Sequence, residues 1–225
     1  MSFDSWRSSE GDPQNGVHVA HGSWTEPIFG RQTVQHALDI DGIVRDDRLG
    51  MLLTLAVATG MRKGELLGLR WQDVDFRAGT LTVRHTLQAQ SRELGQPKTE
   101  RSRRTLQLPG IALSALTEQR KRQAADGIVS HFVFASTAAS PLDARNVSRV
   151  FQKALEQAGL PRQRFHNLRH AFATLMIESG EELAIVSGLL GHSGIGTTAD
   201  TYAHLSGTME RRAADRINAI LNRTG

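Results

Sequence analysis

Apolar residues recur every three to four positions over most of the second half of the chain, which is the spacing of helices that bury one face. Glycine or proline follows several of these segments, as expected just past the end of a helix. A similar series nearer the start is preceded by Asp46 and Asp47, two candidate N-caps. The pattern predicts helices over residues 49–58, 65–69, 111–125, 143–158, 166–179, 181–190, 198–204 and 209–222.

The apolar period shortens from near four to two after residue 80, which indicates strands. Alternate residues from Leu81 to Leu87, including Val83 and His85, would share one face of the first strand. Lys98 lies in a polar turn between two further short segments of this kind, so a hairpin around Lys98 is the simplest arrangement. The predicted strands cover residues 80–87, 94–97 and 103–109.

These patterns predict an α+β fold that is mainly α-helical, with a small three-stranded antiparallel sheet. The first residues differ from the rest because they are rich in Ser, Gly, His, Asp and Pro and lack a sustained apolar period. We therefore expect residues 1–42 to be a polar, largely disordered segment and residues 43–225 to be the folded domain.

The composition excludes several classes of protein. Cysteine is absent, which removes disulfides, thiolate nucleophiles and thiolate zinc sites. The longest nearly apolar run, Met51–Met61, is too short to cross a bilayer, and the first ten residues do not resemble a signal peptide. A membrane protein, a secreted disulfide scaffold and a cysteine enzyme are excluded, and a reducing cytoplasm is permitted.

The distribution of charge is more informative than the net charge of +4. Residues 1–50 carry four arginines and eight acidic residues, so the excess of positive charge lies later in the chain. Residues 84–122 hold nine basic and three acidic residues, and residues 145–169 hold six basic and one acidic. Such segments suit a polyanionic partner such as nucleic acid, although charge alone is also compatible with a solvated surface.

The single tyrosine, Tyr202, is the first candidate for chemistry. Thr197 and Asp200 resemble a capping box, which would place Tyr202 in the first turns of a short helix. Taken alone, a lone tyrosine is more often a half-buried packing residue than a nucleophile. Its phenol has an ordinary pKa of about 10, so nearby groups must help to remove the proton.

A second candidate is the segment His166-Asn-Leu-Arg-His170. His166 and Arg169 are three residues apart and would share one helix face, which pairs an imidazole with a permanent cation and suits a phosphate. The spacing of His166 and His170 also fits a metal site. A zinc metalloprotease would need glutamate where this chain has Asn167, so the metal interpretation is disfavoured.

Two further candidates lie at predicted helix ends. Arg62 falls in a glycine-flanked break, where it could project into a cleft while Glu65 steadies the local backbone. The alternative is a surface arginine paired with Glu65, which contributes little. His192 follows the predicted end of a helix within Gly188-Leu-Leu-Gly-His-Ser-Gly194, and a capping histidine is its simplest explanation.

The order of these polar residues, together with the segments that flank them, resembles the tyrosine recombinase (phage integrase) family. The resemblance is carried by A-T-G-M-R-K-G-E-L-L-G-L-R-W, H-N-L-R-H-A-F-A-T and L-L-G-H-S-G-I-G-T-T-A-D-T-Y-A-H-L. It covers about Asp47 to the C-terminal helix. It implies a mainly helical catalytic domain with a small three-stranded sheet whose second hairpin carries the lysine. The matching positions are Arg62, Lys98, His166, Arg169, His192 and Tyr202.

The resemblance implies a role for each position. Tyr202 would attack a DNA phosphodiester and form a 3′-phosphotyrosyl link with release of a 5′-hydroxyl. Arg62 and Arg169 would balance the charge that builds on the non-bridging oxygens.

For the remaining positions, Lys98 would protonate the leaving 5′ oxygen, His166 would help to take the phenolic proton, and His192 would hydrogen-bond the phosphate. The phosphotyrosine conserves the bond energy, so the reaction needs neither ATP nor a metal, and no cofactor is implied.

The implied partners are double-stranded DNA and further copies of the chain in a tetrameric synapse, with no membrane, in the cytoplasm at the nucleoid. The chain departs from the family pattern at its N-terminus, because residues 1–40 are too few and too polar to form the usual N-terminal helical clamp domain. Two alternatives therefore stay open: a type IB topoisomerase-like nicking and religating enzyme, and a catalytically idle DNA-binding fragment.

The last helix carries one more expectation. Its apolar residues recur at helical spacing from Met209, and Ser206-Gly207-Thr208 would be a short connection before it. We expect this stripe to contact a neighbouring protomer, with burial in its own domain as the alternative.

Overall fold

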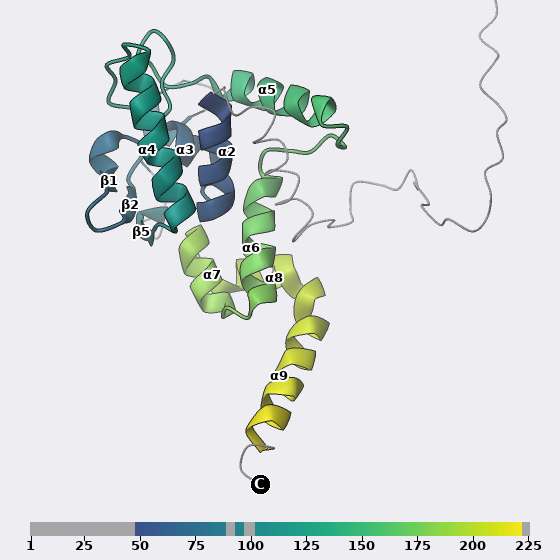
Figure 1. The fold of residues 1–225 in the computed structure, drawn as a ribbon. Helices are drawn as coiled ribbons and strands as arrows, with labels where there is room; N and C mark the ends of the chain where they lie inside the picture. The colour runs from purple at the N-terminus through teal and green to yellow at the C-terminus, as the bar shows by residue number, and fades with distance from the viewer. Residues whose placement is uncertain (1–47, 89–92, 97–101, 222–225) are drawn as a thin grey trace, which may run out of the picture.

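The computed structural model describes residues 48–88, 93–96 and 102–221, which form a mainly helical body around a small sheet (Figure 1). The predicted fold class is confirmed. The segment 1–42, the boundary at residue 43 and Lys98 lie outside the described residues, so what the sequence predicts for them stays a prediction.

Eight α-helices account for most of the described residues, and two single 3-10 turns, Trp71–Asp73 and Ala203–Leu205, join them to other elements. The predicted helices are all present, with ends shifted by up to three residues. Asp143 caps the N-terminus of α5 by accepting hydrogen bonds from two backbone N–H groups, and Gly180 and Gly191 end α6 and α7 in the left-handed conformation. The helices are α2 (Arg48–Thr59), α3 (Lys63–Leu67), α4 (Gly110–Ala125), α5 (Ala144–Gln157), α6 (Asn167–Ser179), α7 (Leu183–Leu190), α8 (Ile195–Tyr202) and α9 (Ser206–Leu221).

The sheet is three-stranded and antiparallel, as predicted, but one of its strands differs from the prediction. Strand β2 (Thr80–Val83) pairs with β1 (Val74–Asp75) on one side and with β5 (Arg104–Gln107) on the other. The segment expected to complete the sheet, β4 (Leu94–Gly95), instead pairs with β3 (Thr86–Leu87) in a separate ribbon. The expected single strand over residues 80–87 is therefore two strands, β2 and β3.

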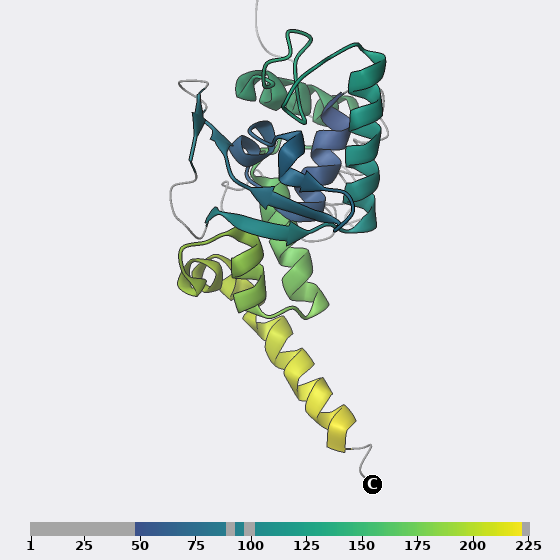
Figure 2. The same ribbon diagram turned by 90° about the vertical axis from the view of Figure 1, so that its left-hand side faces the viewer.

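Helix α2 lies at the centre of the main core, in contact with α4 and α6 (Figures 1 and 2). Leu52 and Leu55 of α2 are fully buried, and Leu81 of the sheet and Phe134 reach the same core. Burial of such side chains is the main stabilising contribution to a domain of this size.

Gly60 joins α2 to the segment that carries Arg62, and the position requires glycine. Its φ is +62°, in the left-handed region, and a Cβ there would lie 2.5 Å from Cδ1 of Phe172 and 3.1 Å from Cδ2 of Leu190. The absence of a side chain thus lets the end of α2 pack closely against α6 and α7.

A second apolar cluster forms where α6, α7 and α8 meet, and it contains Phe172, Ile177, Val186, Leu190 and Tyr202. Two local expectations are wrong here. Helix α8 begins at Ile195 after Gly194, so Tyr202 is its last residue rather than part of its first turns, because the chain enters the helix before Thr197.

Helix α9 begins at Ser206, so residues 206–208 are helical and do not form a connection. Helix α9 then extends away from the body (Figures 1 and 2).

Candidate active site

Tyr202 lies in the second apolar cluster with its hydroxyl on a histidine. Its side chain is 4% exposed, and Oη is 3.0 Å from Nδ1 of His170. Burial raises the pKa of Tyr202 to about 12, although the nearby charge of Arg169 opposes the shift. Burial and Arg169 also lower the pKa of His170, so a neutral phenol faces a neutral imidazole.

His166 immediately precedes α6 and stacks edge-to-face on His170, with ring centroids 4.9 Å apart. Desolvation by the surrounding protein, followed by the charges of His170, Arg169 and Arg62, lowers the pKa of His166 to about 4. His166, His170 and Tyr202 therefore form a row of three contacting rings.

Arg169 of α6 is 3% exposed, and its guanidinium bridges the turn after α2 and the end of α7. Its Nη1 donates to the carbonyl of Gly60 at 2.8 Å and its Nη2 to the carbonyl of Leu190 at 2.6 Å. Burial and the charge of Arg62 lower the pKa of Arg169 to about 9, which still leaves the guanidinium charged at neutral pH. Arg169 thus fixes the end of α7 to the turn that leads to Arg62.

Arg62 stands in the break between α2 and α3, as predicted, and it pairs with Glu65. The carboxylate of Glu65 accepts hydrogen bonds from the backbone N–H and from Nη1 of Arg62, each at 2.9 Å. Glu65 is 3% exposed whereas the side chain of Arg62 is 39% exposed. A buried carboxylate therefore holds a cation that reaches the surface.

His192 directly follows the left-handed Gly191 at the end of α7, as the sequence predicts. Its Nδ1 is 2.8 Å from the hydroxyl of Thr198, which is fully buried in α8. Burial, followed by the charges of Arg169 and Arg62, lowers the pKa of His192 to about 4. The contact with Thr198 leaves Nε2 on the opposite edge of a neutral ring.

Five of the six predicted positions lie in one region. Arg169 bonds the carbonyls of Gly60 and Leu190, which lie two residues before Arg62 and His192, and the neighbouring His170 contacts both His166 and Tyr202. The sixth, Lys98, lies outside the described residues.

Sequence reasoning missed two contributors. The sequence suggests His170 only as a metal ligand, whereas in the structure it contacts Tyr202 from the same helix as Arg169. The buried Arg104 is not a candidate in the sequence, where it is one of many basic residues in its segment.

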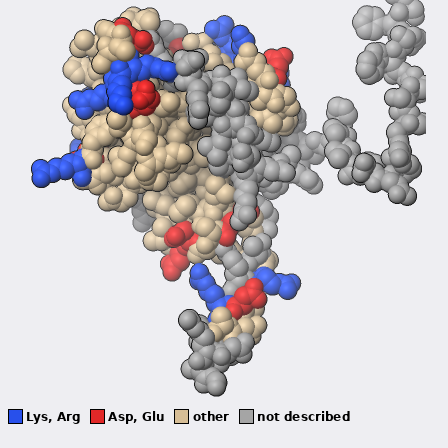
Figure 3. Space-filling model, in the orientation of Figure 1, with Lys and Arg blue, Asp and Glu red and all other residues tan. Residues whose placement is uncertain are grey.

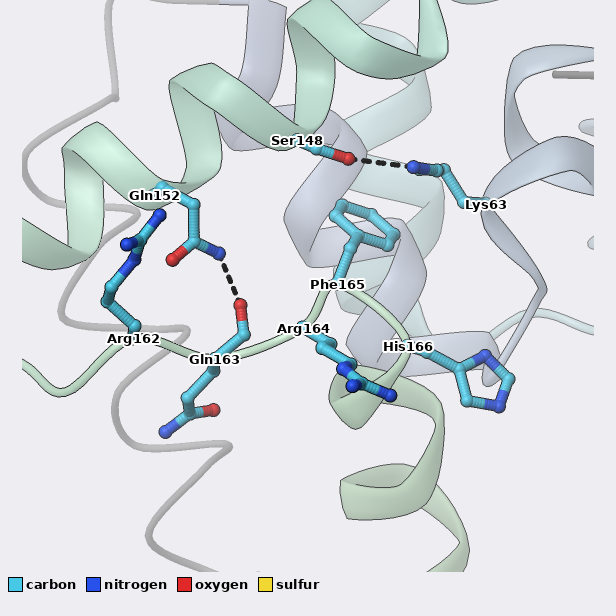
Figure 4. Close-up of a pocket in the computed structure, with 8 residues that line it drawn as sticks. All are labelled: Lys63, Ser148, Gln152, Arg162, Gln163, Arg164, Phe165 and His166. Carbon is cyan, nitrogen blue, oxygen red and sulfur yellow. Dashed lines mark hydrogen bonds between the residues drawn. The ribbon is translucent and has the colours of Figure 1, made fainter. Parts of the chain in front are cut away.

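A cavity of about 690 Å³ adjoins His166 on the side of α5 (Figure 4). Its lining includes Lys63, Arg162 and Arg164, and none of the described residues that line it is acidic. Lys63 donates to the hydroxyl of Ser148 and so joins α3 to α5, whereas Gln152 donates to the carbonyl of Gln163 and so joins α5 to the loop before α6. The cavity can accept an anionic group next to the histidine row.

Comparison with known proteins identifies the fold and the family. The described helices and sheet bring a tyrosine, two arginines and two of the predicted histidines together at one place. The family model "Phage integrase family" matches residues 34–209, and the chain belongs to this family.

Among its relatives, a tyrosine recombinase XerC-like protein of Caldanaerobacter subterraneus subsp. tengcongensis is 34% identical over 198 residues, which cover 79% of this chain and 51% of the relative. An integrase of Streptomyces ambofaciens is 36% identical over 170 residues, covering 67% and 42%. The chain thus spans about half the length of the curated relatives that it matches.

Solved structures agree on the fold. The Tn1549 transposon integrase in complex with circular intermediate DNA aligns with a TM-score of 0.72 at 22% identity, over 88% of this chain and 68% of that one. A lambda integrase tetramer bound to a Holliday junction aligns with a TM-score of 0.54 at 27% identity, over 75% of this chain and 47% of that one.

Within the described residues, no helix is both long and apolar enough to span a membrane.

Proposed function

We propose that this chain cleaves and rejoins DNA strands in site-specific recombination, through a covalent bond between Tyr202 and a 3′ phosphate. The observation that carries the proposal is the position of the only tyrosine in the sequence. Its hydroxyl is hydrogen-bonded to His170, and the charge of Arg169 acts on it. Residues 43–225 would be the catalytic domain, preceded by the separate segment 1–42.

In the proposed reaction, Oη of Tyr202 forms a bond to the scissile phosphorus as the bond from phosphorus to the 5′ oxygen breaks. Arg62 and Arg169 stabilise the charge on the non-bridging oxygens. His192 hydrogen-bonds one of these oxygens through Nε2, and Lys98 gives its proton to the departing 5′ oxygen.

The phenolic proton needs an acceptor because burial raises the pKa of Tyr202 to about 12. The hydroxyl is hydrogen-bonded to His170, so attack requires that His170 accept the proton or that the hydroxyl leave it. His166 touches His170 rather than the phenol, and it would assist through that contact. The lowered pKa values keep both rings neutral at neutral pH, which leaves each a nitrogen lone pair, but they also make the rings weak bases, so proton transfer has to accompany the attack on phosphorus.

Double-stranded DNA is the proposed substrate. The cavity lined by Lys63, Arg162 and Arg164 would take phosphates of the DNA backbone, because cations neutralise phosphate charge. The Tn1549 integrase structure contains DNA, which supports the same substrate for a chain of this fold. A protein with this substrate would act in the cytoplasm, at the nucleoid.

Self-association on DNA, as a tetrameric synapse, is part of the proposal. The lambda integrase structure holds a tetramer on a Holliday junction. In the present chain Ile217 of α9 is 56% exposed on a helix that leaves the body, and such a side chain is available to a neighbouring copy. Figure 3 shows side chains of both charges along this helix, so its polar positions can pair across an interface.

The test is a nicked suicide DNA substrate, on which the cleaved end diffuses away and traps the covalent adduct. We expect an adduct with the native chain and none with Tyr202→Phe, which keeps the ring and should still bind DNA. An adduct with Tyr202→Phe would refute the nucleophile, and no adduct with either chain would favour the idle fragment. Strand transfer between two duplexes separates a recombinase from a topoisomerase-like enzyme, which religates only the same strand.

A further inference from the structure

Arg104 of β5 holds a buried ion pair beside the candidate active site, at a position to which the family motif gives no role in the reaction. Its side chain is 7% exposed, and its Nη2 is 2.9 Å from Oε2 of Glu65, which is 3% exposed. A second hydrogen bond runs from Nη1 to Oε1 of Glu65 at 3.3 Å. The pairing is therefore bidentate, the geometry that a guanidinium and a carboxylate favour.

Glu65 links Arg104 to Arg62, because its carboxylate is hydrogen-bonded to both. The same two carboxylate oxygens that face Arg104 accept hydrogen bonds from the backbone and Nη1 of Arg62. Burial raises the pKa of Glu65, but the hydrogen bonds and charges of Arg104 and Arg62 outweigh this and hold its pKa below the ordinary value. The carboxylate is thus ionised between two cations, and its position depends on both.

Arg104 also reaches the end of α7. Its Nε donates to the carbonyl of Leu189 at 2.6 Å, and Arg169 donates to the next carbonyl, that of Leu190, at 2.6 Å. Two guanidinium groups therefore hold the last turn of α7, which immediately precedes His192. The hydrogen bonds of Arg104 span 39 residues to Glu65 and 85 residues to Leu189, so one side chain ties β5, α3 and α7 together.

We propose that Arg104 is a positioning residue of the active site, which sets the place of Arg62 through Glu65 and the place of His192 through the end of α7. This inference rests on the proposed function. All three guanidinium nitrogens of Arg104 donate to protein acceptors, on Glu65, Leu189 and the Ser102 carbonyl, so it acts through these residues and not on the phosphate.

The chemistry favours positioning over simple stabilisation. A buried ion pair contributes little net stability compared with apolar side chains of similar volume, because both charges lose their hydration. The ion pair instead fixes the orientation of its groups. Five hydrogen bonds from Arg104 and Arg62 hold the two carboxylate oxygens of Glu65 and the carbonyl of Leu189. Preorganised charge is what a phosphoryl-transfer site requires.

The experiment compares Arg104→Met, Arg104→Lys and Arg62→Ala with the native chain. Arg104→Met leaves Glu65 with one cation and can lower stability, whereas Arg104→Lys keeps a charge near Glu65 but cannot make the forked contacts. Arg84→Met is the control for losing an arginine beside a buried carboxylate. Arg84 directly follows β2, its side chain is 51% exposed, and it pairs at 3.2 Å with Asp73, which is 2% exposed and lies in the 3-10 turn Trp71–Asp73. Urea unfolding establishes which variants are folded under assay conditions.

The first readout is the single-turnover cleavage rate at saturating DNA on two substrates. One carries an ordinary scissile phosphate, and the other a methylphosphonate, which lacks the negative charge that Arg62 would balance. On the phosphate we expect both Arg104 variants to lose on the order of 10–100-fold in rate. On the methylphosphonate their defect should shrink in parallel with that of Arg62→Ala, while any defect of Arg84→Met stays the same. Equal defects of Arg104→Lys on both substrates would overturn the proposal.

The second readout is the order of the Arg62 Nε–H group, measured by nitrogen-15 relaxation in the DNA-free chain. We expect it to fall in both Arg104 variants and to be unchanged in Arg84→Met, and unchanged order in Arg104→Lys would overturn the proposal. This readout needs no cleavage. A native chain that forms no adduct would therefore count against the proposed function, while the relaxation data would still decide the role of Arg104.

Discussion

Nδ1 of His170 lies 3.0 Å from Oη of Tyr202, so the candidate nucleophile is hydrogen-bonded to the second histidine of the segment 166–170 and not to the first. The two residues are 32 positions apart and belong to α6 and α8. This bond satisfies a phenol whose side chain is 4% exposed. It couples the chemistry of Tyr202 to the stability of the second apolar cluster.

A double-mutant cycle tests this coupling. We expect His170→Leu to lower the free energy of unfolding by about 1–3 kcal/mol, because the buried hydroxyl of Tyr202 loses its hydrogen bond to His170. In a Tyr202→Phe background the same change should cost about 0.5–1.5 kcal/mol less. The measurement is urea unfolding of the four chains. Strictly additive effects would mean that the bond contributes nothing to the folded state.

Lys98 is tested with a substrate in which sulfur replaces the bridging 5′ oxygen. On ordinary DNA we expect Lys98→Ala to slow cleavage by roughly 10²–10⁴-fold, the usual contribution of a general acid. On the sulfur substrate most of this loss should disappear, since a thiolate leaves without protonation. Arg77→Ala, at an exposed cation outside both basic segments, is the control. Equal losses on both substrates would remove Lys98 from the general-acid role.

Gly60→Ala should destabilise the domain by about 1–3 kcal/mol, through overpacking and an unfavourable positive φ. The new Cβ would lie 2.5 Å from Cδ1 of Phe172, and φ is +62°. Gly188→Ala is the matched control, because Gly188 lies in helix α7 with nothing within 4 Å of its added Cβ. That change should be neutral or stabilising. Equal unfolding midpoints for the two variants would contradict the close packing at Gly60.

Stability should fall as the pH is lowered from about 6.5 toward 4. His166 and His192 have pKa values of about 4 in the folded chain, against about 6.5 when unfolded. In this window the unfolded chain binds more protons, so protonation favours unfolding as the pH drops. The measurement is the urea midpoint at a series of pH values.

Carboxylates such as Glu65, whose pKa is lowered, act in the same direction at more acidic pH. The double variant His166→Asn/His192→Gln separates the histidines from the carboxylates, because it should reduce the fall of the urea midpoint between pH 6.5 and 5, with His170 accounting for what is left. A native midpoint that is already flat there would refute the assignment.

The exposed face of α9 should support assembly on DNA. We expect Ile217→Asp to weaken the formation of higher-order protein–DNA complexes without lowering the unfolding midpoint, since Ile217 is 56% exposed. Asn218→Asp adds the same charge to the next, also exposed, position and is the control. Native gel and sedimentation measurements on DNA provide the readout. If Ile217→Asp instead destabilises the domain, the stripe belongs to its own core.

Much of this protein is determined locally by its sequence. The helical period, the N-cap Asp143 and the helix-ending Gly180 and Gly191 act within a few residues, so the helices they bound were predictable. The order of six polar residues, together with the short segments that flank them, also indicated the family, because such motifs can be recognised without knowing the fold.

Only the tertiary structure decided the rest. A two-residue strand such as Val74–Asp75 carries no period, so its place beside β2 depends on packing. The contact of His170 with Tyr202 spans 32 residues and the pairing of Arg104 with Glu65 spans 39. Neither leaves a local pattern, because such partners are chosen by the close approach of α6 to α8 and of β5 to α3, where a buried charge or hydroxyl must find its complement.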